Sequence, residues 1–522
     1  MNVEIECISL EETKSFSSLF LKYLAGDASL KSYYHRPPTP GSIGEQIKEK
    51  AASYSATHRQ TMAQALQQQY TGLTIVPAVQ QNLEALKDEK TFTVTTGHQL
   101  NIFTGPLYFI YKIATVVDAC RQLKVQHPGY NFVPVYWMAS EDHDLEEINH
   151  LHLYGRSHTW ETDQTGPVGR MNTKGLELML EGMPEKLPLF KEAYHQENLA
   201  AAVRYYVNAL FGEYGVVVVD GDDADLKRLF LPVIEDDVLH HQANDLVEKA
   251  TAELDALGYK SQIYPRKINF FYLEPGQRNR LVHEGDKWQV LNTKTTFTEE
   301  EIRAEMQAHP ENFSPNVVLR PVYQEVILPN LAYVGGPAEV AYWLQLKGVF
   351  DQYQVPYPLV MPRNFGVLLK KGVVEKMDGL GLPITEFFRD EQDIVHDFVQ
   401  RHSENTLTLE AEKEQLKAVY DQLAQKAAQV DATLEGRVGA MLTNAQKEFD
   451  KLEKRLEKSE RDRQEVSVRQ ITAVKGKIFP NGKLQERYDN FLMYALPNPE
   501  LIPDLIEGFN AFDYRMHIFK NI

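Results

Sequence analysis

Blocks of apolar residues in the first 388 positions predict an α/β domain with a parallel sheet. Residues 92–95 (FTVT) and 132–138 (FVPVYWM) are short apolar runs that predict strands. Between them, residues 107–123 are apolar on all sides and contain no Pro or Gly, which predicts a buried helix. Strand, helix and strand in this order form a βαβ unit, and such units build parallel sheets. Runs at 216–219 and 359–361 predict further strands.

Other segments of this region predict additions to the sheet. A polar helix is expected over residues 43–66, after the Pro-rich stretch 36–41. Residues 151–196 are rich in Gly and Thr, and residues 260–297 alternate in a way that indicates β-hairpins. We therefore expect a main domain over residues 1–388, with insertions at about 151–196 and 260–297.

From about residue 389 the pattern changes to that of a coiled coil. Apolar residues step by four and three positions through Leu416, Tyr420, Leu423, Ala427, Val430 and Leu434, and again through Leu442, Ala445, Phe449, Leu452 and Leu456. Gly436 and Gly439 separate the two series, so the segment is either an antiparallel hairpin folded at the glycines or one long broken helix. A seam this narrow needs a partner, which predicts a homodimer; the alternative is that it packs on its own body.

These patterns give a division of the second half of the chain. We assign residues 389–475 to an antiparallel coiled-coil domain. Residues 476–522 contain apolar stretches that predict docking on the main domain.

Composition narrows the classes of partner. A hydrophobic content of 43% with 25% charged residues is typical of a globular protein. The net charge of -18 argues against nucleic acid as the main partner, because phosphate binding needs clustered Lys and Arg, but it does not exclude a nucleotide. The chain has only two cysteines, which fits a reducing compartment. It shows neither the basic and apolar start of a signal peptide nor a run of about 20 apolar residues, so we expect a cytoplasmic protein without a membrane span.

The first candidate for chemistry is the turn 96–106 (TGHQLNIFTGP), which leads from a strand end to a helix start. Gly105 and Pro106 suit a helix start whose amides would bind an anionic group. Five residues of this turn are the predicted contacts: His98 as a catalytic residue, and Gln99, Asn101, Thr104 and Gly105 as substrate-binding residues. The alternative is a capped loop with solvated side chains. The turn is neither a P-loop nor a dinucleotide fingerprint.

The second candidate is the acidic segment 140–150 (SEDHDLEEINH), which follows a predicted strand. Glu141, Asp142 and His143 are the predicted catalytic residues, since a carboxylate beside an imidazole can raise its basicity as a general base. Asn149 is a predicted substrate contact. The same segment could hold a divalent metal or be a solvated loop; because it lacks thiolates and a metalloprotease spacing, we predict no metal.

The third candidate is a set of residues that precede or begin helices. Arg320 can form a bidentate pair with a carboxylate or phosphate, and Glu339 and Tyr342 lie one turn apart on a helix opened by Gly335, Gly336 and Pro337. The alternative for Arg320 is a structural bridge to Glu325 or Glu339. The remaining predicted substrate contacts are Tyr323, Gln324, Arg363 and Asn364.

None of these sets contains an activated nucleophile. A Gly-x-Ser-x-Gly elbow is missing, and neither cysteine has a polar, activating context. The site is therefore expected to bind acidic and amine-bearing small molecules and to move protons between them.

Five sequence motifs carry a family resemblance over nearly the whole chain. The runs TTGHQLNIFTGPLYFIYK, VPVYWMASEDHDLEEINH, LRPVYQEVILPNLAYVGGPAEVAYW with PLVMPRN, and FPNGKLQERYDNFL resemble the bacillithiol biosynthesis cysteine-adding enzymes. The resemblance implies a ligase that adds cysteine to the amine of glucosaminyl-malate. It also implies a Rossmann-like core, related to class I synthetases and nucleotidylyltransferases, with connecting-peptide insertions and a dimeric coiled coil.

The chain departs from the class I synthetase signatures. It lacks the paired histidines at the first turn, and after the strand at 359–361 it has only Pro362-Arg363-Asn364 in place of a Lys-rich loop. Amide formation from a carboxylate in water is uphill, so we still expect ATP to activate the cysteine carboxylate, as an acyl-adenylate or an acyl-phosphate. Arg320 and Arg363 are expected to hold the malate carboxylates. A non-catalytic scaffold protein and a metal-dependent amide hydrolase are the alternative functions.

Overall fold

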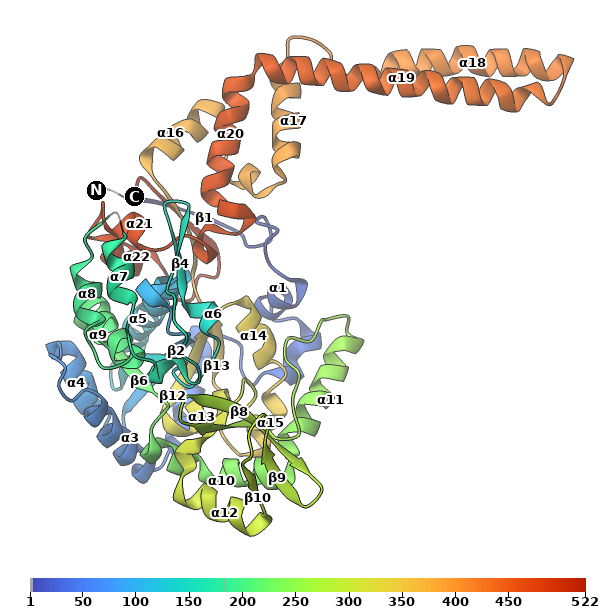
Figure 1. Cartoon of the computed structure of the whole chain (residues 1–522). Coiled ribbons are helices and arrows are strands. Elements are labelled where there is room, and N and C mark those ends of the chain that lie inside the picture. The colour runs from blue at the N-terminus through green and yellow to red at the C-terminus, as the bar shows by residue number, and fades with distance from the viewer. Residues whose placement is uncertain (1–2, 184) are drawn as a thin grey trace. The chain divides into compact units, whose positions relative to one another are not determined.

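Five parallel strands form the central sheet (Figure 1). The structure is a computed structural model that describes residues 3–183 and 185–522. The strand order is β13 (Leu359–Pro362), β12 (Asn330–Gly335), β2 (Thr91–His98), β3 (Asn131–Met138) and β6 (Val217–Asp220), and neighbouring strands are parallel. Every residue of β2 is buried, as in parallel sheets covered on both faces. The predicted α/β class with a parallel sheet is confirmed.

Helix α5 (Tyr108–Gln126) connects β2 to β3 and is the predicted buried helix. Its residues Val116, Ala119 and Leu123 pack with Phe92 and Val94 of β2 in one hydrophobic cluster. Burial of this face explains why the helix has apolar residues on several sides. The packing fixes the loop between β2 and α5 at the carboxyl edge of the sheet.

The helix expected over residues 43–66 is two helices, α2 (Ile43–Ser53) and α3 (Ala56–Gln69). The break has a local cause, because the Ser55 hydroxyl accepts a hydrogen bond from the His58 amide at 3.1 Å and so caps a new helix. Short polar caps of this kind are easily missed in a continuous polar pattern.

Both expected insertions contain antiparallel strands. After β3, helix α6 (Leu145–Ile148) leads into the hairpin of β4 (His150–Leu153) and β5 (Arg156–Thr159). The second insertion contributes to a five-stranded antiparallel sheet with the order β10 (Thr296–Phe297), β9 (Lys287–Val290), β8 (Gln277–Glu284), β7 (Phe270–Glu274) and β11 (Phe313–Pro315). The alternating pattern of this insertion is therefore that of real hairpins.

The C-terminal residues belong to the same compact unit as the sheet. That unit comprises Met1–Glu11, Ser15–Leu368 and Lys483–Ile522. Strand β15 (Met516–Lys520) pairs with β1 (Glu4–Ile8), and the three-stranded order is β1, β15 and β14 (Phe365–Leu369). The two ends of the chain are thus joined in one sheet.

The second unit is helical and comprises Glu12–Lys14 and Leu369–Gly482, so it begins about twenty positions before the predicted boundary at 389. Its helices are α16 (Lys371–Leu380), α17 (Glu391–His402), α18 (Glu410–Val430), α19 (Leu434–Arg463) and α20 (Glu465–Ile478). Helices α18 and α19 form an antiparallel hairpin (Figure 1).

The predicted turn of this hairpin at Gly436 and Gly439 is wrong. Both glycines lie inside α19, and the chain reverses at residues 431–433. The reason is an Asp turn: the Asp431 carboxylate accepts hydrogen bonds from the Thr433 amide at 2.9 Å and its hydroxyl at 2.7 Å. The carboxylate supplies the turn that glycine was expected to supply.

The remaining helices of the first unit surround its sheets. They are α1 (Ser18–Leu24), α4 (Pro77–Ala85), α7 (Leu176–Glu181), α8 (Pro188–Ala193), α9 (Leu199–Phe211), α10 (Ala224–His240), α11 (Gln242–Ala256), α12 (Glu299–Ala308), α13 (Arg320–Ile327), α14 (Pro337–Trp343), α15 (Lys347–Gln352), α21 (Leu492–Ala495) and α22 (Leu501–Gly508). Within the described ranges, no helix combines the length and apolar character needed to cross a membrane.

Candidate functional site

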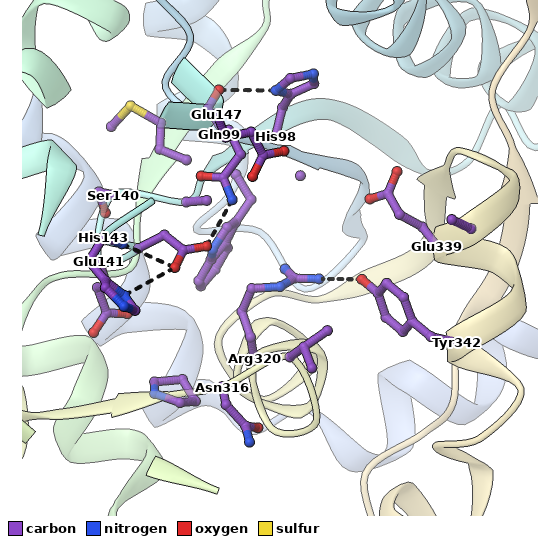
Figure 2. Close-up of a pocket in the computed structure, with 18 of the residues that line it drawn as sticks. His98, Gln99, Ser140, Glu141, His143, Glu147, Asn316, Arg320, Glu339 and Tyr342 are labelled. Carbon is purple, nitrogen blue, oxygen red and sulfur yellow. Dashed lines mark hydrogen bonds and ion pairs between the residues drawn. The ribbon is translucent and has the colours of Figure 1, made fainter. Parts of the chain in front are cut away.

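A cavity of about 660 Å³ opens at the carboxyl ends of β2, β3 and β12 (Figure 2). Its wall includes Gly97 and His98 from the end of β2, Trp137 and Met138 from β3, and Gly336 just beyond β12. Open α/β sheets bind their ligands at this edge. The volume suits a small molecule rather than a macromolecule.

Cations dominate the charged lining of the cavity although the chain carries a net charge of -18. The lining cations are Lys112, Arg266, Arg278, Arg280, Arg320, Arg363 and Arg487, and the lining carboxylates are Glu141, Asp142, Glu147 and Glu339. A local excess of cations concentrates anionic ligands at such a site. The cavity is therefore suited to a ligand with several negative charges.

The predicted turn divides between the cavity and the interior. His98 and Gln99 line the cavity, whereas Asn101, Thr104 and Gly105 are not part of its wall. The Asn101 side chain donates to the Glu147 carbonyl at 3.0 Å, and Thr104 is fully buried. The structure does not bring these three residues to the ligand space.

The helix start after this turn is also occupied, which overturns the expectation that its amides bind an anion. The Leu107 amide donates to the Asp489 carbonyl at 2.8 Å. The Asn490 side chain donates to the carbonyls of Phe103 and Gly105 at 2.8 and 2.6 Å. The C-terminal segment therefore covers the turn and takes the Leu107 amide, a donor that an anion would need.

His98 presents a neutral imidazole to the site. Its Nδ1 lies 3.0 Å from the Gln99 carbonyl and donates to it in the neutral ring, so Nε2 keeps the lone pair. Burial, and then the positive charge of Lys112, lower the pKa of His98 to about 3. Nε2 has no hydrogen-bond partner among the described residues, and the ring stacks on Tyr108 with centroids 5.0 Å apart. His98 is thus a fixed acceptor.

Asp142 and His143 belong to one network centred on Arg278. Asp142 accepts hydrogen bonds from Gln99 at 2.8 Å and from Arg278 at 2.9 Å. Arg278 also donates to Nδ1 of His143 at 3.0 Å. Since a guanidinium can only donate, the neutral His143 ring must carry its hydrogen on Nε2. Loss of hydration, and then Arg278, lower the pKa of His143.

This network changes the chemistry expected of the acidic segment. With its Nδ1 lone pair engaged by Arg278, His143 offers the cavity a donor rather than a base. Glu141 pairs with Lys227, whose side chain is fully buried and also donates to the Phe313 carbonyl at 2.8 Å. Asn149 lies outside the cavity wall, and its side-chain oxygen is 3.3 Å from Nδ1 of His150.

Glu147 is the acidic residue of this segment whose carboxylate is available to accept a proton. It lines the cavity, and its carboxylate has no hydrogen bond or ion pair within the described part of the chain. Loss of hydration, and then the negative charges of Asp142 and Asp144, raise its pKa. An unpaired carboxylate with a raised pKa is a good proton acceptor near neutral pH.

Arg320 faces the cavity from the first turn of α13 (Figure 2). Among the described residues, its guanidinium donates hydrogen bonds only to neutral side-chain oxygens, those of Gln324 at 3.3 Å and of the Tyr342 hydroxyl at 3.5 Å. The alternative of a structural bridge is wrong, because Glu325 pairs with Lys50 at 3.2 Å and Glu339 with Lys112 at 2.6 Å. The charge of Arg320 is therefore free for a ligand.

Glu339 and Tyr342 line the cavity from α14, as expected, but the amides before that helix are used internally. The Glu339 carboxylate accepts from the Gly336 amide at 2.7 Å and from Tyr333 at 2.5 Å. Lys112 also donates to the Gly97 carbonyl at 2.7 Å. Burial alone would raise the pKa of Glu339, but the charge of Lys112 and the hydrogen bonds from Lys112, Tyr333 and Gly336 hold it below its ordinary value. The Glu339 carboxylate is therefore fixed and ionised.

Arg363 is present in the wall but is already paired. It contacts Glu486 through two hydrogen bonds of 2.9 and 2.5 Å, and both side chains are 2% exposed. This pair stands where a malate carboxylate was expected. Four other predicted contacts lie outside the wall: Tyr323, Gln324, Gly335 and Asn364. The Tyr323 hydroxyl donates to the Gly221 carbonyl, and the Asn364 side chain donates to the carbonyls of Asn510 and Asp513.

Several residues of the cavity wall were not among the predicted site residues. They are Tyr108, Lys112, Glu147, Arg266, Arg278, Arg280, Asn316 and Arg487. Arg278 and Arg280 are two positions apart on β8 and so point to one face of it. Two arginines at alternate positions of a predicted hairpin were the sequence pattern that could have identified Arg278 and Arg280 as neighbours on one face.

Comparison with known proteins accounts for nearly the whole chain. The family model "Bacillithiol biosynthesis BshC, N-terminal Rossmann-like domain" matches residues 3–364, and "Bacillithiol biosynthesis BshC, C-terminal coiled-coil domain" matches residues 366–521. The first match assigns the parallel sheet to a Rossmann-like fold. The second confirms a coiled-coil domain in the C-terminal part.

Relatives of similar length have the same name. A protein of Flavobacterium psychrophilum is 40% identical over 99% of each chain. A protein of Flavobacterium johnsoniae is 39% identical over 98% of this chain and 99% of its own, and one of Cytophaga hutchinsonii is 39% identical over 98% of each. All three are named "Putative cysteine ligase BshC".

Proposed function

This chain belongs to the bacillithiol biosynthesis BshC family, and we propose that it is a ligase that joins the carboxyl carbon of cysteine to the amine of glucosaminyl-malate. The observation that carries this proposal is the match of relatives named as cysteine ligases over nearly the entire chain. The product of this reaction is an amide, bacillithiol.

The charge of the cavity supports the proposed acceptor. The malate part of glucosaminyl-malate carries two carboxylates, and Arg320 is a cavity cation that no described carboxylate neutralises. Arg266, Arg280 and Arg487 are further exposed cations of the wall. We assign Arg320 to one malate carboxylate, because a guanidinium binds a carboxylate through two parallel hydrogen bonds.

Activation of cysteine requires a leaving group on its carboxyl carbon. ATP is the proposed source: the carboxylate oxygen attacks phosphorus and expels either ADP or diphosphate, which leaves an acyl-phosphate or an acyl-adenylate. The amine nitrogen then attacks the carboxyl carbon, and the carbon–oxygen bond to phosphate or AMP breaks. Free cations of the wall would stabilise the charge that develops on the phosphate oxygens.

The attacking amine must lose a proton, and we assign that proton to Glu147. Support comes from the free carboxylate of Glu147 and its raised pKa, in contrast to Glu141, Asp142 and His143, which are held by Lys227 or Arg278. In this arrangement Glu141 to His143 shape and orient the site. His98 would accept a hydrogen bond from substrate at Nε2.

A reconstituted reaction tests the proposal. Purified protein is incubated with cysteine, glucosaminyl-malate and ATP, and bacillithiol is followed by mass spectrometry of the thiol-labelled mixture. Product that depends on all three substrates is expected, and the release of ADP or AMP identifies the activated intermediate. A scaffold protein would give no product, and an amide hydrolase would instead cleave added bacillithiol in a chelator-sensitive reaction.

The coiled coil supports the homodimer proposed for this chain. Helix α18 has no buried residue, and Leu423, Val430 and Leu452 of the heptad seam are 45%, 83% and 48% exposed. A second hairpin packed on this seam would cover those side chains. The two free cysteines fit the cytoplasm as the proposed location.

A further inference from the structure

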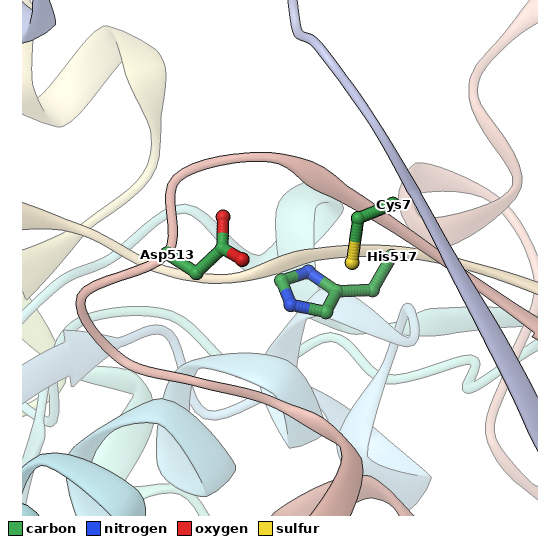
Figure 3. A group of neighbouring side chains, drawn as sticks. All are labelled: Cys7, Asp513 and His517. Atoms are coloured by element: carbon green, nitrogen blue, oxygen red, sulfur yellow. The ribbon is translucent and has the colours of Figure 1, made fainter.

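A thiol, a carboxylate and an imidazole meet where the two ends of the chain pair (Figure 3). Cys7 of β1 and His517 of β15 are direct partners in the antiparallel register, and Asp513 lies in the segment just before β15. Figure 3 shows the Cys7 thiol and the Asp513 carboxylate on either side of the His517 ring. None of the three residues lines the cavity described above.

The backbone fixes these side chains next to one another. Each residue offers one ligand atom, and the three atoms all lie within 4.8 Å of one another. The strand pairing sets the Cys7 and His517 positions, since cross-strand partners hold their Cβ atoms about 4.5–5.5 Å apart. The Asp513 carboxylate is oriented by the Arg515 amide at 3.1 Å and the Arg515 guanidinium at 2.6 Å.

We propose that Cys7, Asp513 and His517 bind one Zn²⁺ ion. Sulfur, nitrogen and oxygen ligands together favour zinc, because magnesium and calcium take oxygen ligands almost alone. In a tetrahedral zinc site with a thiolate and an imidazole, ligand atoms lie about 3.3–3.7 Å apart, which follows from metal–ligand bonds of about 2.0–2.3 Å. The proposed site requires side-chain rotations that bring the three atoms from within 4.8 Å to that spacing, with water in the fourth position.

Neighbouring groups resemble the outer shell of a metal site. Nδ1 of His517 lies 3.1 Å from the Arg515 carbonyl, and a neutral ring that donates there keeps the lone pair on Nε2. Arg515 hydrogen-bonds the Asp513 carboxylate, as ligating carboxylates commonly require. The negative charges of a thiolate and a carboxylate equal the charge of Zn²⁺, and the Arg515 guanidinium adds one positive charge beside Asp513.

The position of this site gives it a structural role. Cys7 lies near the start of the chain and His517 near its end, and both belong to the sheet of β1, β15 and β14. A metal that binds both strands only in the folded state stabilises that state by linkage. Zinc is therefore expected to tie the two ends of the chain together and to raise the melting temperature.

Cobalt substitution tests the site on the full chain. Tag-free protein is stripped with a chelator, kept reduced with a phosphine, and titrated with Co²⁺. The expected result is one Co²⁺ per chain, with a thiolate-to-cobalt charge-transfer band in the near ultraviolet and the visible bands of tetrahedral cobalt. Stoichiometric Zn²⁺ should bleach both signals and raise the melting temperature of the same sample.

The two cysteines of the chain provide the matched variants. Cys7→Ser should lose the charge-transfer band and the zinc-dependent rise in melting temperature, whereas Cys120→Ala, which removes a buried thiol of α5, should keep both. Asp513→Asn should weaken Co²⁺ binding at least tenfold, with circular dichroism confirming the fold. Absence of the band in the wild-type protein, or a band that persists in Cys7→Ser, would overturn the proposal.

Discussion

Glu147 is the residue on which the proposed proton transfer depends. Glu147→Gln keeps the size and hydrogen-bonding capacity of the side chain but removes the base. We expect kcat to fall by about 10²–10⁴-fold, the usual contribution of a positioned general base. Glu146→Gln is the matched control, because Glu146 lies beside it in α6 but outside the cavity wall.

The pH profile gives the same residue a second test. The base must be ionised to accept a proton, so kcat/KM of the wild-type enzyme should rise with pH through the pKa of Glu147. Lost hydration and the charges of Asp142 and Asp144 raise that pKa above the ordinary value of a Glu side chain. In Glu147→Gln this acidic limb should disappear; a limb that persists unchanged would assign the proton to another group.

Arg320 is the residue on which the proposed binding of the malate part depends. Arg320→Gln should raise KM for glucosaminyl-malate about 10–100-fold and leave KM for cysteine unchanged, since a hydrogen bond to a charged group contributes about 1.5–3 kcal/mol. Steady-state kinetics with each substrate varied in turn separates the two effects. Arg303→Gln, at an exposed arginine of α12, is the control. Equal KM values for glucosaminyl-malate would contradict the assignment.

Elements with a strong local pattern were predictable, and contacts between distant elements were not. The apolar runs of β2, α5 and β3 could be predicted from the sequence, because elements buried on several sides have few polar positions. The wall residues Arg278 and Arg487 could not be placed, because β8 and the C-terminal segment reach the cavity only through the tertiary fold. Arg363 was misjudged for the same reason, since its partner Glu486 is distant in sequence.

The hairpin of α18 and α19 is the element on which self-association should depend. Leu423→Glu would place a charge on the heptad seam, where a partner helix would have to bury it. We expect the proposed dimer to dissociate at micromolar concentration in sedimentation-velocity experiments. Gln425→Glu adds the same side chain to the same helix off the seam and should leave the dimer intact. A dimer that survives Leu423→Glu places the contact elsewhere.

At the scale of the whole molecule, the C-terminal segment completes the site begun by β2. Asn490 holds the carbonyls of Phe103 and Gly105, and Arg487 contributes a cation to the cavity wall. The turn after β2 looked like an anion site because its partner backbone comes from the opposite end of the chain. Occupied by that segment, the turn serves to position His98 and Gln99.

The Arg363 and Glu486 pair should carry much of this long-range attachment. Glu486→Gln leaves the Arg363 guanidinium buried without a counter-charge, and loss of one partner of a buried pair costs about 3–5 kcal/mol of unfolding free energy. Urea unfolding followed by fluorescence measures this change. Glu4→Gln removes one partner of an exposed pair with Lys520 and should change stability by less than about 1 kcal/mol. Similar small effects for both variants would mean that the apolar contacts of the segment, rather than this ion pair, hold it on the sheet.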